Sequence, residues 1–282
     1  MDGVVIVGYD KTAAGERALA FAGFEAALHG VALEIVNVVP AAGGRSSAGP
    51  AGAVAAWTVA QGERTARTAR PELRVTKYAA VGSPDQVLTR EARGAGMLVL
   101  GERGHRDFAP LRRGAVTVDV LDRATCPVVV LSPVDHPPRQ RVTVAVDLDE
   151  PIGELLAFAF AEAARRAGPL VVANVCEGHA VPDRRAFDEG DIRSEATLAA
   201  DHVERLAAAA APWRDRYPDV EVEEQVRTGS IGSALVDATR DGDLLIVGGR
   251  RHGDGRPGME IGPAVHTLLH HAECPVAVVP IG

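Results

Sequence analysis

Two things are scarce in this 282-residue chain: cysteine and long apolar runs. Its three cysteines, Cys126, Cys176 and Cys274, are an odd number without a CxxC pair, which argues against a disulfide framework and favours a reducing compartment. No apolar run approaches the ~20 residues that cross a bilayer. No basic segment precedes the first apolar run, at residues 4–7, as a signal peptide would require. We therefore expect a soluble, cytoplasmic protein that does not bind membranes.

Basic residues are in the minority. The chain has 30 Lys and Arg against 38 Asp and Glu, so that its formal net charge is −8. This balance argues against a general nucleic-acid binder, although a local basic patch can still hold one anionic ligand. Hydrophobic residues make up 46% of the chain, which is enough for a core that needs neither metal nor disulfide.

The familiar signatures of catalysis and cofactor binding are also missing. Residues 8–13 do not form the GxGxxG pattern of dehydrogenases, and neither a P-loop, a G-x-S-x-G elbow nor HExxH occurs. His266 and His270 lie four apart on an expected helix, but no acidic or cysteine pattern surrounds them, so we expect solvated side chains and no metal site. Cys126 and Cys274 each precede a proline and are expected to be buried small hydrophobes. We expect no enzyme, with slow ATP hydrolysis left open.

Short apolar runs alternate with helical periodicity through the first half of the chain. A helix ended by Gly30 follows the first run, and Pro84 is expected to open another helix after the N-cap Ser83. This β-α alternation predicts a parallel, doubly wound sheet. The expected strands are residues 4–7, 33–39, 73–81, 97–100 and 127–131, and the later helices are about residues 54–70, 84–93 and 115–123.

The second half repeats the first. Val142–Asp147 restates Val5–Asp10 at an offset of 137 residues, and Gly229-Ser230 restates Gly82-Ser83 at 147. Steady offsets of this kind indicate a tandem duplication of one α/β unit. We predict a first domain at 1–133, a proline-rich linker at 134–140 and a second domain at 141–282.

A glycine-rich loop in the first half is the main candidate for binding. The apolar run 97–100 leads into Gly101, and Gly104 and Gly114 follow, a spacing that lets backbone N–H groups surround a phosphate. Asp10 follows the first expected strand and Val38 lies late on the second. Because the carboxyl ends of parallel strands form a ligand crevice, Asp10 can accept hydrogen bonds from a ribose there, and the backbone at Val38 can contact adenine.

These motifs resemble those of the universal stress proteins, in a tandem form that covers nearly all of both halves. That family carries G-x2-G-x9-G-[ST], an Asp after the first strand and often CPV before the fifth. The resemblance implies two Rossmann-like (adenine nucleotide alpha hydrolase-like) α/β domains. Each would have a five-stranded parallel sheet of order 3-2-1-4-5 with helices on both faces. It further implies ATP, alone or with Mg²⁺, and a stress-response regulator with an unidentified protein partner. The fifth strands would pair within the chain or in a homodimer.

The resemblance also implies a set of nucleotide-contacting residues. In the first half these are Asp10, Val38, Leu100, Gly101, Arg103, Gly104, Gly114, Ala115, Val116 and Thr117, and in the second half they are Asp147, Val175, Gly248 and Gly262.

Departures from the family pattern weaken the second copy most. Ala115 stands where the family's motif has a Ser or Thr. The missing hydroxyl removes a hydrogen bond to a charged group, which is worth ~1.5–3 kcal/mol, or roughly ten- to a hundred-fold in affinity. In the second half Arg251 replaces the middle glycine, and Pro263 replaces the Ser/Thr. We expect the first half to bind nucleotide and the second to be mainly a structural partner. The alternative is an interaction module that has lost nucleotide binding.

Overall fold

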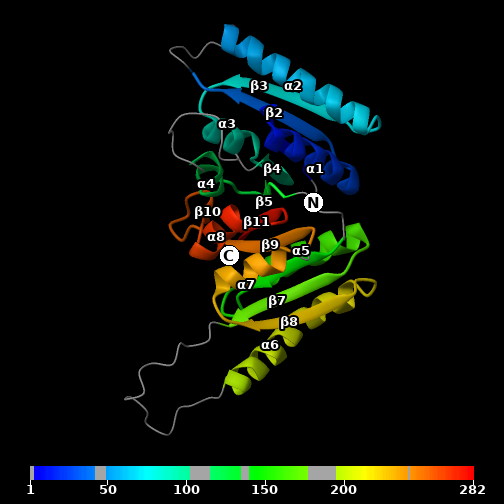
Figure 1. Cartoon of the computed structure of the whole chain (residues 1–282), viewed down its shortest axis with the longest axis vertical. Coiled ribbons are helices and arrows are strands. Elements are labelled where there is room, and N and C mark those ends of the chain that lie inside the picture. Colours follow the sequence, from blue (N-terminus) through cyan, green and yellow to red (C-terminus); the bar gives the residue numbers. More distant parts are fainter. Residues whose placement is uncertain (1–2, 42–48, 102–114, 135–139, 177–194, 241) are drawn as a thin grey trace. The chain divides into compact units, whose positions relative to one another are not determined.

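The computed structural model describes most of the chain (Figure 1). The described residues are 3–41, 49–101, 115–134, 140–176, 195–240 and 242–282. Two compact units divide the chain. Unit 1 contains residues 1–135, 249–262 and 275–280, and unit 2 contains 136–248, 263–274 and 281–282. Two segments of the second sequence repeat therefore pack in unit 1.

Unit 1 is built on a parallel sheet whose strand order confirms the 3-2-1-4-5 prediction for the first repeat. The order is β3-β2-β1-β4-β5, and Val5 of β1 is in register with Leu33 on one side and Met97 on the other. The strands are β1 (Val5–Gly8), β2 (Leu33–Val39), β3 (Val75–Val81), β4 (Met97–Gly101) and β5 (Val128–Leu131). β1, β4 and β5 are buried, as their β-branched and leucine side chains require when helices cover both faces.

The helices of unit 1 lie on both faces of this sheet, α1 packing against α2 and α3 against α4. They are α1 (Ala13–His29), α2 (Pro50–Ala69), α3 (Pro84–Glu91) and α4 (Ala115–Leu121). Gly30 ends α1 in the left-handed region at φ 67°, as predicted. α2 begins at Pro50, four residues before the expected start, because proline fixes a helical φ at the first position. Ser83 holds the N-cap position of α3, but its hydroxyl bonds the Asp85 carboxylate and no helix N–H.

One further strand of unit 1 comes from the end of the second repeat. β11 (Val276–Ile281) pairs antiparallel with β5, Val276 opposite Val130 and Val278 opposite Val128. The last strands of the two repeats are thus hydrogen-bonded within one chain, which is the intramolecular pairing that the resemblance implies.

Unit 2 repeats the first sheet over four strands, in the order β9-β6-β7-β8. Its strands are β6 (Val142–Val146), β7 (Leu170–Cys176), β8 (Val222–Thr228) and the first part of β9 (Leu244–Arg251). Val142 is in register with Leu170 and Leu244, the counterparts of Leu33 and Met97 at offsets of 137 and 147 residues. The duplication therefore extends to strand register. The helices are α5 (Gly153–Arg166), α6 (Glu195–Arg216), α7 (Ile231–Thr239) and α8 (Pro263–His271).

The second glycine segment differs from the expected loop. β9 does not stop at Gly248 but continues to Arg251, and it pairs antiparallel with the short strand β10 (Met259–Glu260). A Cβ on Gly249 would lie 2.7 Å from the Met259 sulfur, so the two strands of this hairpin approach closely. The sequence did not predict this hairpin, because its glycines suggested a worn phosphate loop. We call residues 249–262 the hairpin.

No helix among the described ranges is long and apolar enough to cross a membrane. Cys126 and Cys274 are buried as predicted, at 4% and 1% exposure, and burial raises the pKa of each thiol to about 12. Cys176 is only half-buried, although desolvation raises the pKa of its thiol as well.

We expect Ellman's reagent to modify one thiol per native chain, that of Cys176. The other two thiols are both inaccessible and protonated at neutral pH. A Cys176→Ser variant should lose the native reaction and retain two thiols after denaturation. Reaction of Cys126 or Cys274 in the native protein at the rate of Cys176 would contradict this assignment.

Candidate functional site

Four of the sequence-predicted residues of the first repeat lie at the carboxyl edge of the unit 1 sheet. β1 and β4 are neighbours at the point where strand order reverses, which is where such sheets bind ligands. Asp10 follows β1, Val38 is half-buried on β2, and Leu100 and Gly101 end β4. We call this edge the first crevice.

The rest of the predicted set belongs to the segment after β4. Ala115, Val116 and Thr117 form the first turn of α4. Arg103, Gly104 and Gly114 lie outside the described residues, so the phosphate part of the prediction stays a prediction.

Asp10 orients the first turn of α1. Its Oδ1 accepts hydrogen bonds from the Thr12 hydroxyl at 2.6 Å and from the Thr12 backbone N–H at 3.1 Å. The Thr12 Oγ1 in turn accepts from the Gly15 N–H at 3.1 Å and caps the helix. A Cβ on Gly15 would lie 2.5 Å from the Asp10 Oδ1, so glycine permits this approach. The carboxylate is therefore fixed at the crevice by the helix that follows it.

Gly101 has a packing role that is independent of any ligand. A Cβ at this position would lie 2.5 Å from the Ala14 carbonyl oxygen, which is backbone and cannot move aside. Glycine at the end of β4 is thus required for α1 to lie against the strand. The sequence pattern alone cannot separate this requirement from phosphate binding.

Tyr9 and Asn37, which sequence reasoning did not assign, lock the end of β1. The Asn37 amide donates from Nδ2 to the Tyr9 carbonyl at 2.6 Å, and the Tyr9 hydroxyl donates to Glu16 Oε1 at 2.5 Å. Both side chains are buried, and burial together with Glu16 raises the pKa of Tyr9, which keeps the hydroxyl protonated. The Asn37 Oδ1 is buried without a hydrogen-bond partner in the described part of the chain.

A cation lies at the same edge. Lys11 follows Asp10 with a left-handed φ of 62°, and its ammonium lies 4.2 Å from the ring centroid of Trp57 on α2. Trp57 is 52% exposed, so the pair is at the surface. Lys11 therefore adds positive charge beside the first crevice.

The second repeat has the same asparagine, and there both the nitrogen and the oxygen of the side-chain amide have hydrogen-bond partners. Asn174 Nδ2 donates to the Val146 carbonyl at 2.9 Å, across the same 28-residue separation as Asn37 and Tyr9. Its Oδ1, however, lies 2.7 Å from His202 Nδ1 of α6 and 3.5 Å from the Cys176 sulfur. In the second repeat the His202 imidazole thus contacts the amide oxygen of Asn174. The corresponding oxygen of Asn37 has no hydrogen-bond partner among the described residues.

Arg205 of α6 holds the turn after β6. Its guanidinium donates to the Leu148 carbonyl at 2.9 Å and to Asp149 Oδ1 at 2.7 Å, and this hydrogen bond lowers the pKa of the Asp149 carboxyl. The exposed Asp147 accepts from the Asp149 N–H at 3.0 Å. Val175 lies on β7, and Gly248 lies inside β9, where a Cβ would be 2.6 Å from Ile281 Cδ1.

The first repeat has neither of these α6 side chains. α2 ends at Ala69 and α6 at Arg216, an offset of 147 residues, so His202 corresponds to Ala55 and Arg205 to Thr58. Ala55 is fully buried and has no polar group. The Thr58 hydroxyl donates to the Val54 carbonyl of its own helix at 2.9 Å.

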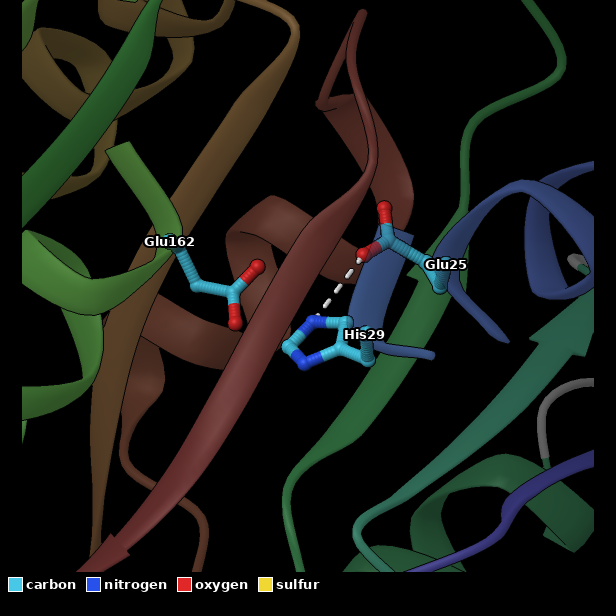
Figure 2. A group of neighbouring side chains, drawn as sticks. All are labelled: Glu25, His29 and Glu162. Carbon is cyan, nitrogen blue, oxygen red and sulfur yellow. Dashed lines mark ion pairs between the residues drawn. The ribbon is translucent and has the colours of Figure 1, made fainter. Parts of the chain in front are cut away.

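Buried ion pairs at the far end of α1 and α5 are a second feature that the sequence reasoning missed. Glu25 lies 3.6 Å from His29 on α1 with both side chains fully buried (Figure 2). In unit 2, Glu162 of α5 pairs with Arg166 at the positions 137 residues on. Extending the repeat alignment along both helices would have found these pairs. α1 runs away from Asp10, so Glu25 and His29 lie outside the first crevice.

A known protein family matches each of the two repeats. The model of the universal stress protein family matches twice, at residues 3–132 and 138–280. Universal stress protein Rv2005c of Mycobacterium tuberculosis is 28% identical over 97% of this chain and 96% of its own length. A universal stress protein of Mycolicibacterium smegmatis is 29% identical over 98% and 96%.

Solved structures resemble the whole chain as well. A universal stress protein from Archaeoglobus fulgidus covers 99% of this chain and 98% of its own, with a TM-score of 0.67 and 16% identity. A putative universal stress protein from Pseudomonas aeruginosa covers 98% and 92%, with a TM-score of 0.63 and 15% identity. At this identity the likeness shows the fold.

We expect Gly101→Ala to lower the free energy of unfolding by about 1–3 kcal/mol in the absence of any nucleotide, because the new methyl group collides with the Ala14 carbonyl. Gly82→Ala is the matched control, since its Cβ would lie 3.7 Å from a Val87 methyl group in ordinary contact. Urea unfolding of both variants measures the difference. Equal stability of Gly101→Ala and the parent would refute the packing role.

Proposed function

Because the chain belongs to the universal stress protein family, we propose that its first repeat binds ATP and that nucleotide occupancy regulates its contacts with a partner protein. The observation that carries the proposal is the difference between the two copies of the crevice. In the second copy His202 and Arg205 engage Asn174 and the turn after β6. In the first copy the corresponding residues are Ala55 and Thr58.

Each residue of the first crevice then has a role. The Asp10 carboxylate, which Thr12 holds at the end of β1, accepts hydrogen bonds from the ribose hydroxyls. The backbone at Val38 contacts the adenine edge. Lys11 and Arg103 offset the phosphate charge, with or without Mg²⁺. Ala115 supplies no hydroxyl, so the affinity should be modest.

We propose a regulator and no enzyme. The crevice offers binding groups of a kind that position a nucleotide, and we assign no side chain to activating a water molecule. Phosphate release from labelled ATP at the rate in buffer agrees with this role, and release well above buffer would favour a slow ATPase.

A second candidate is an interaction module of the same fold that no longer binds nucleotide. Ala115 favours it, because the missing hydroxyl costs the site a hydrogen bond to a charged group. Both candidates use the protein as a regulator, and they differ in whether ATP is bound.

The deciding measurement is nucleotide content. Freshly purified protein is denatured and the supernatant is chromatographed, and ATP is titrated calorimetrically into nucleotide-free protein. About one ATP per chain supports the proposal. No released nucleotide together with no binding heat would favour the interaction module.

We further expect Ala55→His to weaken ATP binding at least tenfold. The substitution places in the first repeat an imidazole at the position that His202 has in the second, where it contacts Asn174. Thr58→Arg should act in the same direction. Ala56→His is the matched control, since Ala56 is exposed on the same turn of α2. Thermal unfolding checks that the variants fold. Parent-like ATP affinity in both variants would show that α2 does not border the nucleotide.

A further inference from the structure

The hairpin that replaces the second glycine loop contacts the end of α4 of the first repeat. His252 Nε2 lies 2.9 Å from the carbonyl oxygen of Asp122, the residue that follows α4, and the His252 side chain is 2% exposed. The Asp122 N–H still bonds back to the Val118 carbonyl of the helix. Both partners belong to unit 1. A buried imidazole therefore satisfies a carbonyl that the helix end leaves unpaired.

Gly258 brings the hairpin backbone to the same point. It is buried with a φ of 119°, and any Cβ there would collide with the Asp122 carbonyl oxygen and approach Arg123 Cα to 2.7 Å. Both the conformation and the space restrict this position to glycine. The contact is thus backbone against backbone, with little room for adjustment.

Charged groups surround the contact. The Asp122 carboxylate has Oδ1 3.3 Å from His252 Nε2 and Oδ2 3.5 Å from the Arg256 guanidinium. Glu260 of β10 has Oε1 3.8 Å from His252 Nδ1. From the first repeat itself, Asp85 of α3 binds the neighbouring Arg123 at 2.5 Å. The C-terminal end of α4 is therefore held from two sides, and the hairpin supplies one of them.

We propose that the hairpin positions α4 for nucleotide binding in the first repeat, with His252 as the positioning residue. This inference rests on the proposed function. α4 has seven residues and is roughly 10 Å long, so a fixed C-terminal end also fixes its first turn. That first turn consists of Ala115, Val116 and Thr117, the residues assigned to the nucleotide.

The proposal also accounts for the altered sequence of the second motif. Arg251, in place of the middle glycine, pairs with Met259 in the β9–β10 ladder. Ten residues separate Arg251 from Gly262, one more than the nine between Gly104 and Gly114, and all ten lie within the hairpin. The segment that departs from the phosphate pattern thus contacts α4 of the other repeat.

The test compares four variants of the full chain. His252→Ala removes the donor to Asp122, His252→Gln keeps an amide donor, and Gly258→Ala forces the hairpin away. Gly253→Ala is the control, because a Cβ at that hairpin position meets nothing within 4 Å. ATP affinity is measured by calorimetry, and hydrogen exchange of residues 115–124 and 249–262 is measured with and without ATP.

We expect His252→Ala and Gly258→Ala to bind ATP about tenfold more weakly, and His252→Gln and Gly253→Ala to stay within about twofold of the parent. By linkage, ATP should slow hydrogen exchange in the hairpin of the parent, an effect that a merely structural contact would not produce. Should Gly258→Ala fail to fold, the comparison of His252→Ala with His252→Gln decides.

The outcomes separate the inference from the proposed function. Without ATP, faster exchange of residues 115–124 in His252→Ala supports the positioning of α4, even if the parent binds no nucleotide and the proposed function fails. Unchanged exchange there, or ATP binding by His252→Ala at parent affinity, overturns the inference and leaves the proposed function intact.

Discussion

A buried asparagine amide holds the turn after the first strand of each repeat, and the geometry of both crevices depends on it. Asn37 reaches the Tyr9 carbonyl, and Asn174 reaches the Val146 carbonyl, across the same separation in sequence. The bond fixes the end of one strand to its parallel neighbour and so sets the direction in which Asp10 or Asp147 leaves the sheet. Because the amides are buried, loss of either one would leave the Tyr9 or the Val146 carbonyl with neither this hydrogen bond nor water in its place.

The two copies differ in how they complete this shared frame. In the second, His202 uses the remaining oxygen of the asparagine and Arg205 fastens the adjacent turn, so side chains of α6 take up the polar groups of the crevice. In the first, small residues of α2 stand at those positions. At this frame the repeats therefore differ in the side chains of α2 and α6, while the register of the strands is the same in both.

The sequence predicts the parts of this structure that depend on local pattern. Runs such as Val5–Gly8 and Met97–Gly101 are apolar and β-branched or leucine-rich because they are buried on both faces. The repeated offsets of 137 and 147 residues reveal the duplication. The hairpin escaped prediction because glycine is compatible with loops and with close strand approach alike. Its partner, Asp122, lies 130 residues from His252, and no local signal reports such a contact.

The crevice itself is only partly predictable for a related reason. Gly101 satisfies a steric demand of α1 whether or not a phosphate is bound, so its presence says less about ligands than its spacing suggests. Asn37 and Tyr9 act through a hydrogen bond between separate strands. That Ala55 corresponds to His202 can be recognised only after the ends of α2 and α6 have been aligned.

The antiparallel pairing of β5 with β11 has a consequence for assembly. β5 is a short strand of four buried apolar residues, and without β11 its outer edge would present unpaired N–H and C=O groups to any other strand. In the tandem chain the strand that closes this edge is tethered to it, so that dilution does not open the pair. A strand pairing that would depend on concentration between separate chains is here a property of a single polypeptide.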